Sequence, residues 1–149
     1  IDIAIDAIKS AKHKHNFYGI DKIGNPCTLQ TKGNSHCHII LRGGKSRPNY
    51  YLDDVNALTN VAPIMIDCSH DNSKKDYKNQ ETVLQYCLSH YLRVSNVFGF
   101  MLESNINEGK QSNLPNCNLK YGISITDSCI NLETTKRLIT RLYDELGLI

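Results

Sequence analysis

Three short apolar runs end abruptly in polar or ionisable residues, and they constrain the fold more than any other feature. The runs cover residues 38–41, 63–66 and 97–102, and none of them alternates polar with apolar side chains. A strand that is covered on both faces reads as such a continuous apolar run, as in parallel sheets. The pattern therefore predicts a parallel sheet with helices packed against it.

Helix-compatible segments separate the apolar runs, and this order indicates the α/β class. Helices are expected at residues 2–12, 53–60, 80–92 and 133–146. Two β-prone runs at residues 16–20 and 27–31 flank a segment with turn chemistry, which predicts a β-hairpin. The polar stretch 109–120 has no periodicity and is expected to form a surface or active-site loop.

Composition narrows the class of protein. The chain has 149 residues, which fits one domain, and a formal net charge of +2, which gives no reason to expect nucleic-acid or membrane binding. No apolar run is long enough to span a bilayer. The six cysteines are scattered and form no CxxC pair. We therefore expect free thiols in a reducing cytoplasm.

Ionisable side chains follow each apolar run. Arg42 follows the first, His70 the second and Glu103 the third, while Asp127 precedes the last predicted helix. Because carboxyl ends of parallel strands share one edge, functional groups gather there. One histidine with two carboxylates suits Mn²⁺ or Fe²⁺. A hydrogen-bonded loop histidine, a salt-bridged glutamate and a turn aspartate are the ordinary alternatives, and spacing alone leaves both interpretations open.

Arg42 stands directly before Gly43 and Gly44. Glycines let the backbone approach a ligand, and a guanidinium group binds phosphate oxygens in a fork, so this arrangement suits a phosphate group. A surface arginine in a turn is the alternative.

Five stretches carry a resemblance to a known family: "HIILRGGK", "PNY", "MIDCSHDNSKKDY", "FMLESNINEGKQS" and "KYGISITDSCI". In this order they resemble the C-terminal part of a bacterial feedback-regulated DAHP synthase (3-deoxy-D-arabino-heptulosonate 7-phosphate synthase). The amino-acid sequence of these stretches is most similar to the tyrosine-sensitive branch of the family. The resemblance implies that residues 1–149 form the last three strands of a (β/α)₈ TIM barrel, with an inserted regulatory β-hairpin at residues 16–31.

The resemblance also implies an activity. The family condenses phosphoenolpyruvate with D-erythrose 4-phosphate and water to give DAHP and phosphate, the first step of the shikimate pathway to aromatic amino acids. His70, Glu103 and Asp127 would then bind one divalent metal ion (Mn, Fe, Co or similar), and Arg42 would bind the phosphoenolpyruvate phosphate. The full-length form is expected to be a cytoplasmic homo-oligomer.

The hairpin at residues 16–31 matches the family's regulatory element, which binds an inhibiting aromatic amino acid. Phe17, Gly19 and Leu29 fall at its effector-facing positions. The resemblance to the tyrosine-sensitive branch implies that the effector is tyrosine.

The sequence departs from the family in two ways. A (β/α)₈ barrel takes about 250 residues, and the family's Gly-Pro-Cys-Ser stretch, with the fourth metal ligand, and its Lys-Pro-Arg-Thr motif for erythrose 4-phosphate do not occur here. The helix expected between residues 51 and 63 also looks shortened, and there is an extra residue near 46–47. We therefore expect these residues alone to be inactive and unable to fold stably.

Two alternatives remain beside a DAHP synthase. A related 3-deoxy-octulosonate 8-phosphate synthase is disfavoured by the hairpin and by "YGISITDSCI". A non-catalytic remnant is disfavoured by the retained residues His70, Glu103, Asp127 and Arg42.

Overall fold

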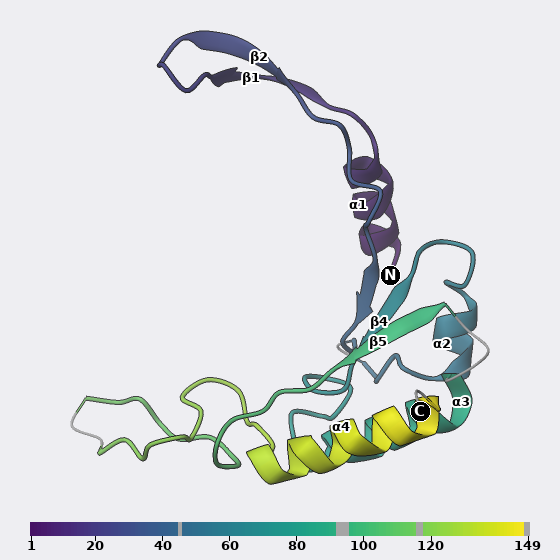
Figure 1. Cartoon of the computed structure of the whole chain (residues 1–149), viewed down its shortest axis with the longest axis vertical. Coiled ribbons are helices and arrows are strands. Elements are labelled where there is room, and N and C mark those ends of the chain that lie inside the picture. The colour runs from purple at the N-terminus through teal and green to yellow at the C-terminus, as the bar shows by residue number, and fades with distance from the viewer. Residues whose placement is uncertain (45, 92–95, 116–117, 148–149) are drawn as a thin grey trace.

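The computed structural model describes residues 1–44, 46–91, 96–115 and 118–147. The chain begins with helix α1 (Asp2–Lys12) and continues into a hairpin of β1 (Asn16–Ile20) and β2 (Pro26–Gln30). Figure 1 shows this hairpin projecting from the body of the molecule beyond the far end of α1. The hairpin is therefore a separate appendage to the sheet and its helices.

The hairpin is antiparallel, as predicted, with Phe17 paired to Leu29 and Ile20 to Pro26. Its second strand begins at Pro26, one residue earlier than expected, because proline is tolerated as the first residue of a strand. Asp21 stabilises the turn: its Oδ1 accepts hydrogen bonds of 2.9 Å from both Ile23 N and Asn25 N. These bonds hold the pKa of Asp21 below its usual value, the Asn25 bond most strongly.

The body of the molecule is a parallel sheet in the order β3-β4-β5, which confirms the predicted α/β class. Its strands are β3 (Ile39–Leu41), β4 (Ile64–Asp67) and β5 (Val97–Met101). Leu41 pairs with Ile66, and Asp67 pairs with Met101. The carboxyl ends of all three strands therefore lie at one edge.

Three helices accompany the sheet: α2 (Leu52–Asn56), α3 (Asn79–Tyr91) and α4 (Leu132–Leu146). The predicted helix 53–60 is wrong in length, because α2 ends at Asn56. The chain continues in tight turns, in which Leu58 N donates to Val55 O and Val61 N donates to Leu58 O. Asparagine and threonine are weak helix formers, and this segment is rich in them.

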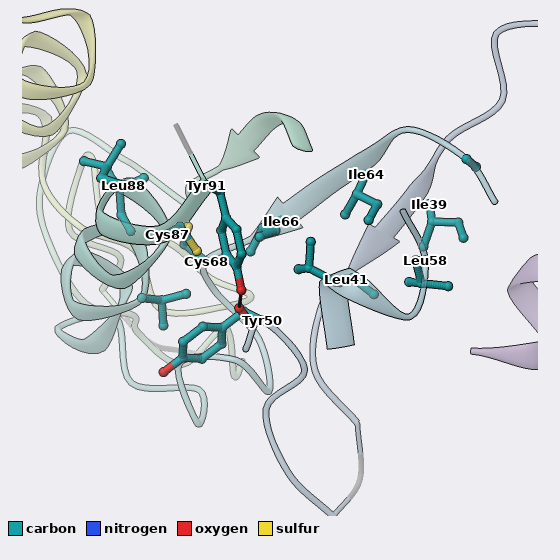
Figure 2. Close-up of a cluster of buried hydrophobic side chains, with 14 of the residues drawn as sticks. Ile39, Leu41, Tyr50, Leu58, Ile64, Ile66, Cys68, Cys87, Leu88 and Tyr91 are labelled. Carbon is teal, nitrogen blue, oxygen red and sulfur yellow. Dashed lines mark hydrogen bonds between the residues drawn. The ribbon is translucent and has the colours of Figure 1, made fainter. Parts of the chain in front are cut away.

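The core lies between one face of the sheet and its helices (Figure 2). Its fully buried members include Ile64, Ile66 and Leu41, and Tyr91 Oη donates a 2.7 Å hydrogen bond to Tyr50 O beside them. On the opposite face Ile40 is 50% exposed, and Met65, its neighbour on β4, is partly buried. The predicted parallel sheet with helices packed against it is therefore confirmed for one face of the sheet.

The five described cysteines are free thiols, as expected, and Cys117 lies outside the described residues. Burial raises the pKa of Cys87 to about 12 and that of Cys68 well above its ordinary value. These two thiols are thus neutral packing groups at neutral pH. None of the helices in the described ranges combines the length and apolarity that crossing a bilayer would need.

Candidate metal centre

Three predicted site residues meet at the carboxyl edge of the sheet. His70 follows β4, Glu103 follows β5, and Asp127 comes from the loop before α4. His70 Nε2 lies 3.4 Å from Glu103 Oε1 and 3.8 Å from Asp127 Oδ2. Within the described residues the donor atoms of these three side chains all lie within 4.8 Å of one another. Tertiary structure has brought together groups that are 33 and 24 positions apart in the chain (103 − 70 and 127 − 103).

The local environment leaves room for an ion. The side chains of His70 and Glu103 are 18% and 22% exposed, whereas that of Asp127 is 62% exposed. A cavity of about 40 Å³ lies between them, and Lys75 and Lys110 are at its wall. The site is therefore half-buried and is most exposed at Asp127.

Asp67 orients the histidine ring. Its carboxylate is 2% exposed, and its Oδ2 lies 2.7 Å from His70 Nδ1. Its Oδ1 accepts from Ser69 N at 2.8 Å and from Ser69 Oγ at 2.9 Å, so the carboxylate is held in place. A carboxylate that accepts the Nδ1 proton fixes the tautomer in which Nε2 is free to bind a metal.

The donor set also fits a divalent ion chemically. An imidazole nitrogen and two carboxylate oxygens from three separate segments suit Mn²⁺, Fe²⁺ and related ions. His70 has a φ of 49°, which is uncommon for a non-glycine residue. Such backbone strain concentrates at functional sites. The geometry therefore fits the metal centre that the sequence predicted.

A buried asparagine joins the ends of β3 and β4. Asn72 is 3% exposed, and its Nδ2 donates to Leu41 O at 2.9 Å and to Asp67 O at 2.8 Å. Gly43, with a φ of 91°, packs so closely here that a Cβ would lie 2.6 Å from Asn72 N. The loop after β3 is therefore locked against the loop that contains His70.

Arg42 follows β3 at this same edge but is exposed, and no contact joins it to the three clustered residues in the described structure. Nearby, Arg47 makes two hydrogen bonds, of 2.9 and 2.7 Å, to the carboxylate of the buried Asp54. The Asp54 hydrogen bond and charge raise the pKa of the Arg47 guanidinium. Arg47 is thus engaged in holding its loop to α2, whereas Arg42 is exposed and has no such ion pair in the described structure.

The remaining predicted residues lie on the hairpin. Phe17 and Leu29 face each other across the strands, and Gly19 shares their side because side chains alternate along a strand. A Cβ on Gly19 would overlap the end of the Leu29 side chain. Phe17 is 50% exposed, so this side of the hairpin offers an apolar surface away from the metal centre.

Several residues around the centre were not predicted from the sequence. Asp67 stands three residues before His70, a spacing that was visible but had no assigned role. Asn72, Lys75 and Lys110 carry no local signal that distinguishes them from ordinary loop residues. Their positions follow from turns and loop packing, which sequence periodicity does not report.

Fold and site together define an α/β protein with a candidate divalent-metal centre at the carboxyl edge of a parallel sheet. Residues 1–140 match the model of the DAHP synthetase I family, and the chain belongs to this family.

Curated relatives are similar along nearly the whole chain. The Tyr-sensitive phospho-2-dehydro-3-deoxyheptonate aldolase of Enterobacter agglomerans is 44% identical over 153 residues, which cover 96% of this chain and 71% of that protein. The tyrosine-inhibited aldolase of Candida albicans is 42% identical, covering 94% and 41%. The Tyr-sensitive aldolase of Escherichia coli K12 is 41% identical, covering 97% and 43%.

A solved structure agrees. The phospho-2-dehydro-3-deoxyheptonate aldolase of Francisella tularensis SCHU S4 superposes with a TM-score of 0.86 at 37% identity, over 97% of this chain and 44% of that one. The chain therefore spans less than half of this structure and of two of the three relatives above, and 71% of the third.

Proposed function

We propose that this chain supplies the last three strands of the (β/α)₈ barrel of a DAHP synthase. The observation that carries the proposal is the cluster of His70, Glu103 and Asp127 at the carboxyl edge of the sheet, in a member of the DAHP synthetase I family. Within the described residues β3 and β5 are the outer strands of the sheet and Ile40 is 50% exposed, which supports the proposal because a closed barrel would pair the outer strands and fill its interior. Residues 1–149 would then be one part of a longer catalytic domain.

The proposed reaction joins phosphoenolpyruvate to the aldehyde carbon of D-erythrose 4-phosphate. A new carbon–carbon bond forms, water is consumed, and inorganic phosphate leaves, so that the products are DAHP and phosphate. Arg42 binds the phosphate of phosphoenolpyruvate through its guanidinium fork. Its exposed position at the edge of the sheet supports this role.

His70, Glu103 and Asp127 would hold the divalent ion, which supplies Lewis-acid chemistry when bound. Asp67 accepts a hydrogen bond from His70 Nδ1–H, which holds the proton on Nδ1 and leaves Nε2 directed toward the two carboxylates. The buried Asn72 holds the loop of Arg42 to that of His70, so that the phosphate and metal sites keep a fixed separation. We assign the full-length protein to the cytoplasm as a homo-oligomer, on the family's properties.

The experiment that tests this function is an assay of the natural full-length protein after its intact mass and N-terminal sequence are measured. We expect a mass well over twice 16.8 kDa, and Mn²⁺-dependent release of phosphate from phosphoenolpyruvate with erythrose 4-phosphate. Turnover with arabinose 5-phosphate instead would identify the eight-carbon synthase. A natural chain that begins near Ile1 and has no activity would identify a remnant.

The hairpin at residues 16–31 is the proposed regulatory element, and tyrosine is its proposed ligand. The names of relatives from Enterobacter agglomerans, Candida albicans and Escherichia coli describe them as tyrosine-sensitive or tyrosine-inhibited. Phe17 and Leu29 offer apolar contacts for an aromatic ring, and the absence of a Cβ at Gly19 makes room for the Leu29 side chain. The appendage position supports a role outside the reaction itself (Figure 1).

Replacing Gly19 by alanine is expected to relieve inhibition by tyrosine, because the added methyl group would displace Leu29 into the effector space. The tyrosine concentration for half-inhibition should rise at least about tenfold, which corresponds to roughly 1.4 kcal/mol of binding free energy, while kcat stays unchanged. Tyr18→Ala is the matched control, since Tyr18 points to the opposite side of the hairpin and is 92% exposed. Equal inhibition of wild type and Gly19→Ala would contradict the assignment.

A further inference from the structure

A glutamine side chain is fully buried beside the candidate metal centre. Gln80 lies in the first turn of α3 and has 0% exposure. A buried amide is costly unless both its ends are hydrogen-bonded. Both ends of the Gln80 amide are hydrogen-bonded to the backbone of Glu103. Glu103 N donates to Gln80 Oε1 at 2.8 Å, and Gln80 Nε2 donates to Glu103 O at 3.2 Å. The side chain therefore closes a two-point clamp on the backbone of a candidate metal ligand.

This clamp acts where the sheet no longer holds the chain. The ladder between β4 and β5 ends at the pair Asp67 and Met101, with one further bond from Cys68 N to Met101 O. Glu103 lies beyond that point. Its N–H is bonded by Gln80, and its C=O also accepts from Ile130 N at 3.0 Å. Removing the amide would leave the Glu103 N–H without its partner.

We propose that Gln80 is a positioning residue, which holds Glu103 so that its carboxylate faces His70 Nε2 and thereby sets the affinity of the centre for a divalent ion. The inference rests on the proposed metal centre and deepens it. Residues that orient metal ligands affect metal affinity without touching the ion. Gln80 acts through the backbone of Glu103, whereas Asp67 acts through the side chain of His70.

The test measures binding of Mn²⁺ alone by calorimetry to the full-length protein, with no substrate present. Gln80→Met keeps the length and volume of the side chain but removes both hydrogen bonds. We expect the dissociation constant for Mn²⁺ to rise roughly 10- to 100-fold. In amide hydrogen exchange, the Glu103 N–H should lose protection in the same variant.

Two controls lie on the same helix. Gln85→Met makes the identical substitution at a residue whose amide bonds the Glu81 carboxylate, and it should leave Mn²⁺ affinity unchanged. Val83→Ala creates a cavity at a residue that is 2% exposed, so it lowers the melting temperature of the metal-free protein without touching Glu103. It should also leave Mn²⁺ affinity unchanged.

The outcomes separate the inference from the function on which it rests. Wild-type Mn²⁺ affinity in Gln80→Met, together with lost binding in His70→Ala, would overturn the role of Gln80 and leave the metal centre standing. Unchanged binding in His70→Ala would overturn both. An equal loss of Mn²⁺ affinity in Val83→Ala would show that lower overall stability explains the loss in Gln80→Met, and would overturn the inference. If Gln80→Met does not fold, Gln80→Asn is used, since it keeps an amide but is too short to span both bonds.

Discussion

Replacing His70 by alanine in the full-length protein is expected to abolish both metal binding and turnover. The substitution removes the nitrogen donor that faces Glu103 and Asp127 at 3.4 and 3.8 Å. A bound ion contributes several kcal/mol to the stabilisation of transition-state charge, and each 1.36 kcal/mol is a factor of ten in rate. We therefore expect kcat/KM to fall at least about 1000-fold. Steady-state phosphate release and Mn²⁺ calorimetry measure the two effects.

His90→Ala is the matched control. His90 is an exposed histidine of α3 whose Nδ1 lies 2.7 Å from Tyr86 O, away from the centre. This variant should keep wild-type metal binding and kcat/KM. A His70→Ala enzyme that binds Mn²⁺ normally and retains more than a tenth of wild-type activity would show that His70, Glu103 and Asp127 form an ordinary ion-pair cluster.

Residues 1–149 expressed by themselves are expected to lack a cooperative unfolding transition. In the part of the chain that the structure describes, no further strand joins the sheet beyond the outer strands β3 and β5, and Ile40 and Phe98 are 50% and 54% exposed. Edges and apolar faces of this kind favour aggregation over a unique fold. The free energy of unfolding should fall well below the roughly 5–15 kcal/mol of ordinary domains.

Circular dichroism during heating measures this, with the full-length protein as the control. The full-length chain should melt in one sharp transition, whereas the 149 residues should lose their signal gradually or precipitate. Coincident near- and far-ultraviolet transitions of the isolated residues in the range of about 45–65 °C would contradict the prediction, because that range is ordinary for independent domains.

Local patterns predicted most of the elements. The continuous apolar runs became β3, β4 and β5, and the hairpin formed with its second strand shifted by one residue. The failures have physical causes. Helix α2 stopped early because asparagine and threonine compete with helical bonding. Continuous apolar runs are typical of strands that are covered on both faces. In the described residues one face remains partly exposed, as at Ile40, because the runs do not show which chain segment packs against it.

The candidate site divides in a similar way. His70, Glu103 and Asp127 were predicted from strand ends and from the family resemblance, and the structure brings them together. Arg42 was predicted at the same edge. In the described structure it makes no contact with the three clustered residues, and its binding of a phosphate stays a prediction. The supporting contacts of Asp67 and Gln80 were not predicted, because a buried polar residue in a sequence does not reveal its partner.

The sequence alone determined the types of most elements, the parallel direction of the strands and the kinds of side chain that follow each strand. These depend on periodicity and on residue chemistry. Only the tertiary structure decided that Asp67 bonds the His70 ring and that Gln80 holds Glu103 from 23 positions away. The physical reason is that such contacts depend on strand register, helix orientation and backbone conformation at the ends of elements. Those quantities are set by the packing of the whole sheet and its helices.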